Sequence, residues 1–80
     1  MLEVLQFSAN FCAPCHALSR ALRERKVTKI NINKTPEIAE QYNVRSAPIL
    51  LFLKDGTEVH RHKGVISLED FDKILEELYT

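Results

Sequence analysis

Two cysteines separated by two residues, Cys12 and Cys15, are the residues of this 80-residue chain whose type and spacing point most directly to chemistry. A disulfide between them would close a very short loop and would add little stability through loop closure. Two cysteines are also too few to staple a secreted scaffold. We therefore interpret the pair as a reagent, a dithiol that exchanges with disulfides.

Cys12 is expected at the mouth of a helix that begins near Pro14. Unpaired backbone N–H groups and the positive end of the helix dipole favour a thiolate at such a place. There the pKa of a thiol can fall from about 8.5 to between about 3.5 and 7.5. Cys12, the more exposed position, is predicted to attack a substrate disulfide. Cys15, one turn further on, is predicted to resolve the mixed disulfide and release the reduced substrate.

Hydrophobic periodicity predicts the elements that position these cysteines. Continuous or alternating apolar runs favour strands, whereas apolar residues at helical spacing favour helices. The predicted strands cover residues 2–7, 27–33, 49–53 and 57–63. The predicted helices cover residues 14–25, 36–42 and 68–78.

Local signals mark where several of these elements begin or end. Thr35 is predicted to cap a helix whose first residue is a proline, and Asn43 is predicted to end it in a left-handed conformation. The Asp55–Gly56 pair predicts a hairpin turn. Ser67 is predicted to cap the last helix, with Asp70 as the acid of a capping box.

The order of elements is therefore βαβαββα, which predicts an α/β fold. A helix joins the first two strands, which should be parallel with a right-handed crossover, and the hairpin is antiparallel. We expect a mixed four-stranded sheet flanked by three helices on both of its faces. The chain shows no repeat or linker, so residues 1–80 are expected to form one domain.

Composition narrows the classes of function. Hydrophobic residues make up 45% of the chain and charged residues 28%, which is typical of a globular protein. Eleven basic and eleven acidic residues cancel, so binding to nucleic acid is not expected. No apolar run approaches the roughly 18 residues of a membrane span, and the first residues do not resemble a signal peptide. A reducing cytoplasm is the expected location.

Several motifs along the chain resemble those of the thioredoxin family. Residues 11–15, Phe-Cys-Ala-Pro-Cys, resemble its Trp-Cys-Gly-Pro-Cys active site. Residues 29–33 and 42–48, with Pro36 between them, resemble the family's run before a cis-proline. Asp55–Gly56 and Gly64 continue the resemblance, which extends from Val4 to about Leu78. It implies a thioredoxin-like fold and thiol–disulfide oxidoreductase activity, that is, an enzyme.

The resemblance also implies a site for substrate proteins. It implies that Pro48 is cis, lies beside the cysteines and leaves the Ala47 backbone free to pair with an extended segment. The implied apolar groove is lined by Phe11, Ala13, Pro14, Ala47, Pro48, Gly64 and Val65. Disulfide-bearing proteins are the implied substrates, and thioredoxin reductase or glutathione is the implied electron donor. No cofactor or metal is expected, and the protein is expected to be a monomer.

Three departures from the family pattern bear on mechanism. The chain begins directly on the strand before the cysteines, which implies a minimal, glutaredoxin-sized version of the fold. Gln6 stands where the family has a buried aspartate that helps to deprotonate the resolving thiol, whereas Lys29 matches the family's lysine near that acid. Phe11 and Ala13 replace Trp and Gly. We predict that Cys15 loses its proton to water and that Gln6→Asp changes the rate of resolution.

Other interpretations of the cysteines remain open at this stage. A glutathione-dependent, glutaredoxin-like reductase is one, although residues 64–67 match the glutathione-contacting motif poorly. A thioredoxin-like interaction module without turnover is another, as is a structural pair. Cys-x-x-Cys followed by His16 also fits a haem-attachment motif. A metal site would need further ligands from His16, His60 and His62, and the predicted topology separates His60 and His62 from His16. His16 either favours the Cys12 thiolate or is a solvated helix residue.

Overall fold

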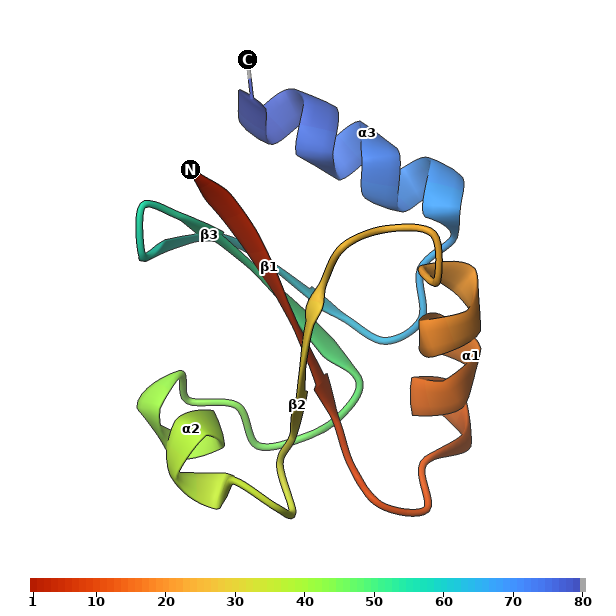
Figure 1. Ribbon diagram of the computed structural model, residues 1–80, viewed down its shortest axis with the longest axis vertical. Helices are drawn as coiled ribbons and strands as arrows, with labels where there is room; N and C mark the ends of the chain where they lie inside the picture. The colour runs from red at the N-terminus through yellow and green to blue at the C-terminus, as the bar shows by residue number, and fades with distance from the viewer. Residues whose placement is uncertain (80) are drawn as a thin grey trace.

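The computed structural model describes residues 1–79 and contains all seven predicted elements in the predicted order (Figure 1). The four strands and three helices give the α/β class that the periodicity predicts. The strands are β1 (Leu2–Ser8), β2 (Thr28–Asn31), β3 (Ile49–Lys54) and β4 (Thr57–Lys63). The helices are α1 (Ala13–Ala21), α2 (Pro36–Gln41) and α3 (Leu68–Tyr79).

The strands form one mixed sheet in the order β2-β1-β3-β4. β1 is parallel to β2 and antiparallel to β3, and β3 is antiparallel to β4. β1 and β3 are the central strands, which explains their nearly continuous apolar sequences, because both of their faces are covered. β2 lies at one edge and β4 at the other.

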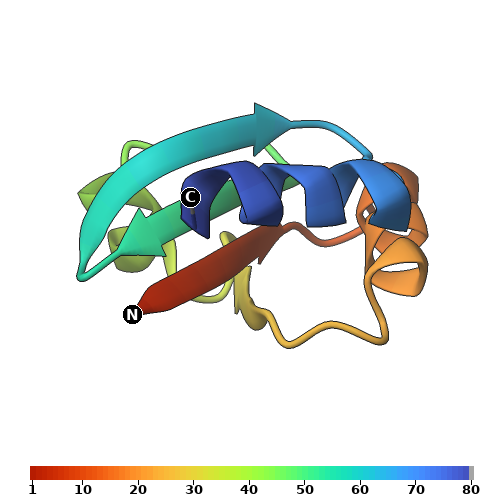
Figure 2. The same ribbon diagram turned by 90° about the horizontal axis from the view of Figure 1, so that it is seen from above.

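Each face of the sheet is covered by different helices (Figures 1 and 2). α1 and α3 pack on one face, over a buried cluster of Val4, Leu18, Leu22, Leu50, Phe52, Ile66 and Phe71. α2 packs on the other face, over a buried cluster of Leu5, Phe7, Ala39, Val44, Ile49, Leu51 and Leu53. The two clusters take alternate residues of β1 and β3, as the two-residue period of a strand requires. None of the helices within residues 1–79 has the length and apolar character of a membrane span.

α1 ends at Ala21, so the prediction that it continues to Arg25 is wrong. The chain turns after Leu22, where the Arg25 amide donates to the Leu22 carbonyl over 2.9 Å. Leu22 is buried, and Val27 packs on the same core cluster. Burying both residues requires the chain to turn back toward β1, and this packing overrides the helical propensity of the basic residues.

β2 covers residues 28–31, which is shorter than the predicted 27–33. The side chain of Asn31 ends the strand, because its Oδ1 accepts hydrogen bonds from the amides of Asn33 (2.8 Å) and Lys34 (3.3 Å). Asparagine competes with the strand ladder in this way by forming a local turn.

Most of the predicted end signals are confirmed. Asn43 is left-handed (φ 56°), and Asp55 and Gly56 both have positive φ, as the hairpin turn requires. The Ser67 hydroxyl accepts from the amide of Asp70 over 3.1 Å. Thr35 does occupy the position before α2, but its side chain does not cap the helix. Its hydroxyl donates instead to the carbonyl of the last residue of β2 over 3.1 Å.

Candidate active site

Four loops meet at one end of the sheet. The register pairs Phe7 of β1 with Ile49 of β3, and Ile49 with Lys63 of β4. The loop that follows β1, the residue that precedes β3 and the loop that follows β4 therefore emerge together. β2 runs parallel to β1 and also ends here, with Asn31 paired to Ser8. This end of the sheet holds both cysteines and the predicted groove residues.

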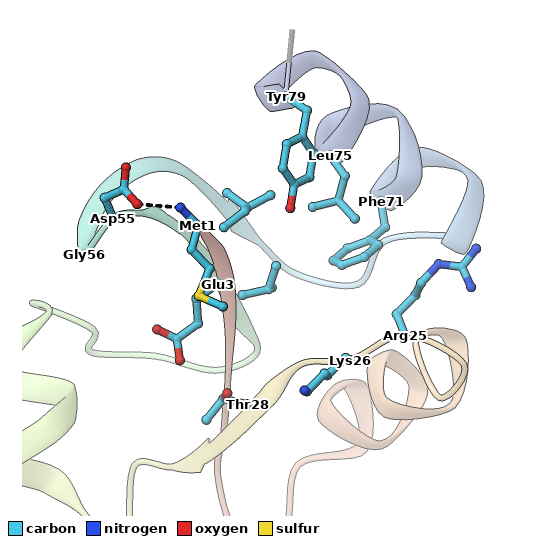
Figure 3. A pocket seen from close by; sticks show the side chains of 12 residues that line it. Met1, Glu3, Arg25, Lys26, Thr28, Asp55, Gly56, Phe71, Leu75 and Tyr79 are labelled. Atoms are coloured by element: carbon cyan, nitrogen blue, oxygen red, sulfur yellow. Dashed lines mark hydrogen bonds and ion pairs between the residues drawn. The ribbon is translucent and has the colours of Figure 1, made fainter.

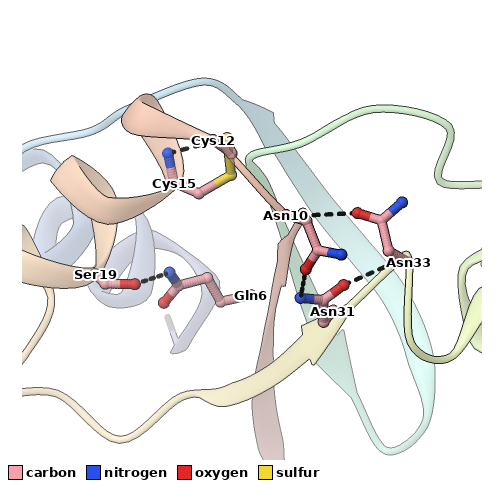
Figure 4. The surroundings of a disulfide bond; sticks show 7 residues. All are labelled: Gln6, Asn10, Cys12, Cys15, Ser19, Asn31 and Asn33. Atoms are coloured by element: carbon pink, nitrogen blue, oxygen red, sulfur yellow. Dashed lines mark hydrogen bonds between the residues drawn. A yellow bond between two sulfur atoms is a disulfide. The ribbon is translucent and has the colours of Figure 1, made fainter.

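Cys12 and Cys15 form a disulfide with a Cα–Cα distance of 5.2 Å (Figure 4). Cys12 has an extended backbone and occupies the N-cap of α1. Its Sγ accepts a hydrogen bond from the Cys15 amide over 3.2 Å, so one free N–H at the start of the helix points at the sulfur. Cys15 is 3% exposed and Cys12 is half-buried, which confirms the predicted order of exposure.

Phe11, immediately before the disulfide, is fully exposed at 104% and has a left-handed backbone with φ 55°. This conformation is unfavourable for a bulky residue that is not glycine. The aromatic ring gains no burial in return. An exposed apolar ring held in this way next to Cys12 is available to contact another molecule.

The Ala47–Pro48 peptide is cis, as the resemblance implies. Pro48 is buried, and its carbonyl accepts a hydrogen bond from the amide of Gly64 over 3.0 Å. Gly64 has φ 99°, a conformation that only glycine adopts readily. The next residue, Val65, is 48% exposed. The structure thus brings the Pro48 turn and the loop after β4 into direct contact.

Three asparagines that the sequence analysis did not select fasten the loop after β1. The Asn10 amide donates to Oδ1 of Asn33 over 2.8 Å, and Nδ2 of Asn31 donates to Oδ1 of Asn10 over 3.1 Å (Figure 4). These bonds tie the segment that carries the cysteines to the end of β2. A signal was present, since asparagines cluster at two segments that the topology brings together.

Gln6 is 1% exposed, and its Nε2 donates to the hydroxyl of Ser19 on α1 over 2.9 Å (Figure 4). Its Oε1 is buried without a hydrogen-bond partner among residues 1–79. Ser19 was not predicted as a site residue. Lys29 is paired with Gln6 through the backbone register, but its side chain is exposed.

A cavity of about 320 Å³ adjoins the buried cysteine. It is lined by Ser8, Ala9, Asn10, Phe11, Cys15, His16, Ser19 and Asn31. His16 is exposed at its rim. The other two histidines lie on β4, where the ring of His60 contacts Phe52 at a centroid distance of 5.4 Å and His62 faces the carbonyl of Val65. Within the described chain, no three His, Cys, Asp or Glu residues are grouped so that they could hold a metal ion.

A larger cavity, of about 540 Å³, is separate from the cysteines (Figure 3). It lies between the start of β1 and α3, and its lining includes Val4, Phe71 and Leu75. The terminal amine of Met1 forms an ion pair with Asp55 at its rim. Hydrogen bonding to this amine and its charge lower the pKa of the Asp55 carboxyl. No sulfur of the Cys12–Cys15 pair lines this cavity.

Comparison with known proteins agrees with this geometry. The thioredoxin family model matches residues 1–77. The thioredoxin of Chlamydia trachomatis is 37% identical over 82 residues, covering 94% of this chain and 78% of that protein. The thioredoxin of Chlamydia caviae is 37% identical over 81 residues, covering 92% of this chain and 76% of that protein.

Solved structures show the same arrangement of helices and strands. A mutant thioredoxin from Halobacterium salinarum superposes with a TM-score of 0.85 at 27% identity, covering 95% of this chain and 73% of that one. Malassezia sympodialis thioredoxin, at 18% identity and a TM-score of 0.83, shares the fold over 95% of this chain and 73% of its own. This chain belongs to the thioredoxin family and is a dithiol thiol–disulfide oxidoreductase.

Proposed function

We propose that the protein reduces disulfides of other proteins, with Cys12 as the nucleophile and Cys15 as the resolving thiol. The single observation that carries this assignment is the asymmetry of the pair. The sulfur of Cys12 caps the N-terminus of α1 on the accessible side, whereas Cys15 is 3% exposed. This difference in exposure supports Cys12 as the sulfur that an incoming disulfide meets first.

The reaction balances in two exchanges. The Cys12 thiolate attacks one sulfur of the substrate disulfide, and the other substrate sulfur leaves as a thiolate. The Cys15 thiolate then attacks the sulfur of Cys12. The bond between Cys12 and the substrate breaks, the substrate becomes fully reduced and the Cys12–Cys15 disulfide forms. A dithiol of a reductase such as thioredoxin reductase, or two molecules of glutathione that end as one glutathione disulfide, must return two electrons to this disulfide.

The surface around Cys12 supports a polypeptide as substrate. Phe11 and Val65 are exposed apolar side chains in loops at the same end of the sheet. The buried Pro48 immediately precedes β3 there, and the Ala47 backbone before it can pair with an extended segment. Ala13, Pro14 and Gly64 complete the proposed contact surface with small or rigid residues that allow close approach.

Reduction of insulin by this protein, with dithiothreitol as the final reductant, tests the proposal. We expect Cys12→Ser to abolish turnover, and Cys15→Ser to accumulate a mixed disulfide with the substrate. Ser46→Ala serves as a control that leaves both sulfurs in place. A folded wild-type protein that never accelerates insulin reduction would instead be a non-catalytic interaction module.

The electron donor and the setting are further parts of the proposal. Only two cysteines are present and both lie in the site, so no cysteine remains for a structural disulfide. This usage suits a reducing cytoplasm. Parallel assays with thioredoxin reductase plus NADPH and with glutathione alone would identify the donor. We propose a monomer, which light scattering behind gel filtration tests directly; a mass of two chains would contradict it.

A further inference from the structure

A polar pair formed by one buried and one half-buried side chain adjoins the resolving cysteine and has no part in the exchange described above. Gln6 lies on β1 and Ser19 on α1, and they are joined by the 2.9 Å hydrogen bond from Nε2 to the hydroxyl oxygen (Figure 4). Ser19 follows Cys15 by four residues, so the two side chains are neighbours on one face of α1. Gln6 is the one buried polar side chain among the described residues.

The hydrogen bonds of this pair are incomplete. Because Nε2 of Gln6 already donates to the oxygen of Ser19, the hydroxyl proton of Ser19 is directed to some other acceptor. The Oε1 atom of Gln6 is buried and has no partner within residues 1–79. Buried polar atoms in proteins are nearly always satisfied, and ordered water commonly satisfies those that protein groups do not.

The cavity of about 320 Å³ gives water access to the Ser19 end of this pair. Both Cys15 and Ser19 line it, together with polar residues from β1, β2 and the intervening loop. Its volume exceeds the roughly 30 Å³ that one water occupies in the liquid. None of the described lining residues is a carboxylate, and His16 is the titratable neighbour of Cys15 among them. Lys29 is the partner of Gln6 in the β1–β2 register, and its cationic side chain is exposed.

Resting on the proposed function, we propose that Ser19, held by Gln6, is a positioning residue for the resolving step. The Cys15 thiol gives its proton to water in the cavity, and the Ser19 hydroxyl, directly or through that water, hydrogen-bonds the resulting thiolate. The thiolate then attacks the Cys12 sulfur, and the departing substrate sulfur takes up a proton from solvent. No additional oxidant or reductant is involved.

Stopped-flow mixing of the reduced protein with a chromogenic aromatic disulfide separates the two exchanges. Attack by Cys12 releases one coloured thiolate and resolution by Cys15 releases a second. We expect Ser19→Ala to slow the second phase by about tenfold, since a hydrogen bond to a charged group is lost, and to shift its pH midpoint upward. The first phase should be unchanged. Ser19→Thr keeps the hydroxyl and should restore the second phase, and Arg20→Ala on the exposed face of α1 is the matched control.

The double variant Gln6→Met/Ser19→Ala guards against misfolding, because removing both partners of a partly buried hydrogen bond leaves no orphaned group. It should be folded and equally slow in the second phase. The proposal would be overturned if the rate of the second phase were unchanged at every pH in Ser19→Ala or in the double variant. It would also be overturned if the pH midpoint of that rate shifted in His16→Asn and in no Ser19 variant. A wild-type protein without a second phase would instead refute the proposed function itself.

Discussion

Within residues 1–79, the buried side chains on the face of the sheet under α2 are all apolar, whereas the face under α1 and α3 also contains Gln6. β1 contributes to both. Leu5 and Phe7 point to the α2 side, while Val4 packs under α1 and α3 and Gln6 reaches Ser19 on α1. Alternate residues of β1 thus place two apolar side chains on the α2 face, and one apolar side chain and one amide on the opposite face.

This difference between the two faces separates residues that affect only the stability of the fold from residues that also affect the disulfide exchange. A buried amide with an unpaired oxygen contributes less to stability than an apolar residue of similar size would. Gln6 lies beside α1, the helix that carries Cys15, and there its hydrogen bond to Ser19 can serve the resolving step. We therefore expect changes on the α2 face to affect the free energy of unfolding alone, and changes at Gln6 to affect the reaction as well.

Phe7→Ala is expected to have the largest effect. Phe7 is 0% exposed and its ring makes an edge contact with Tyr42 at a centroid distance of 6.1 Å. The lost burial and the resulting cavity should reduce the free energy of unfolding by about 3–5 kcal/mol. Urea unfolding measures this loss. Both stopped-flow phases, corrected for the folded fraction, should keep their wild-type rates. Slower resolution would show that the α2 face also affects the reaction, which would contradict the comparison.

Gln6→Asp should affect both properties. Burial disfavours the charged carboxylate and raises its pKa in the folded state, so its destabilising effect should be absent below about pH 4, the unfolded-state pKa, and should grow as the pH rises from there through the raised folded-state pKa. We expect a cost of about 1–3 kcal/mol at neutral pH, measured by urea unfolding. Resolution should become faster, because a carboxylate can accept the Cys15 proton. Gln6→Asn, which has the same shape as the aspartate without the charge, is the control; equal resolution rates at every pH would refute the prediction.

Arg61→Ala should weaken the α2 side by about 1 kcal/mol. The guanidinium donates to the carbonyls of Tyr42 (2.7 Å) and Asn43 (3.2 Å) after α2, and it also binds Glu58. Hydrogen bonding from Arg61 lowers the pKa of the Glu58 carboxyl. Arg61→Lys, which cannot reproduce the forked contact, should recover only part of the loss in urea unfolding. If either variant changed the rates of disulfide exchange, the α2 side would also affect the reaction, and the expected difference between the two faces would be wrong.

Asp72→Asn should have the smallest effect, and one that depends on pH. The hydrogen bond from Arg25 lowers the pKa of the Asp72 carboxyl, so this pair stabilises the fold above about pH 4 and loses its contribution as the pH falls through the lowered pKa. Thermal unfolding should show a slightly lower midpoint for Asp72→Asn at neutral pH and no difference in acid. The looser 3.7 Å pair of Glu69 with Lys73 gives the control, Glu69→Gln, which should match wild type. A difference that persists in acid would exclude the ion pair as its cause.

Periodicity predicted the element order and the mixed sheet because each strand and helix here has a clear apolar pattern. It placed the ends of α1 and β2 less well. α1 stops at Ala21 because Leu22 is buried, and Val27 packs, against residues far away in sequence. β2 stops at Asn31 because of a side-chain turn that a strand pattern does not reveal.

The candidate site divides in the same way. The spacing of Cys12 and Cys15 and their place before a helix are local properties, so the dithiol chemistry and the order of exposure followed from the chain alone. The cis bond before Pro48 came from family resemblance, and the asparagine network and Ser19 were missed. Their contacts join residues between 13 and 23 positions apart, which only the packing of α1 and β2 against β1 brings together. Local patterns thus specify which residues can react, and tertiary packing decides which polar groups surround them.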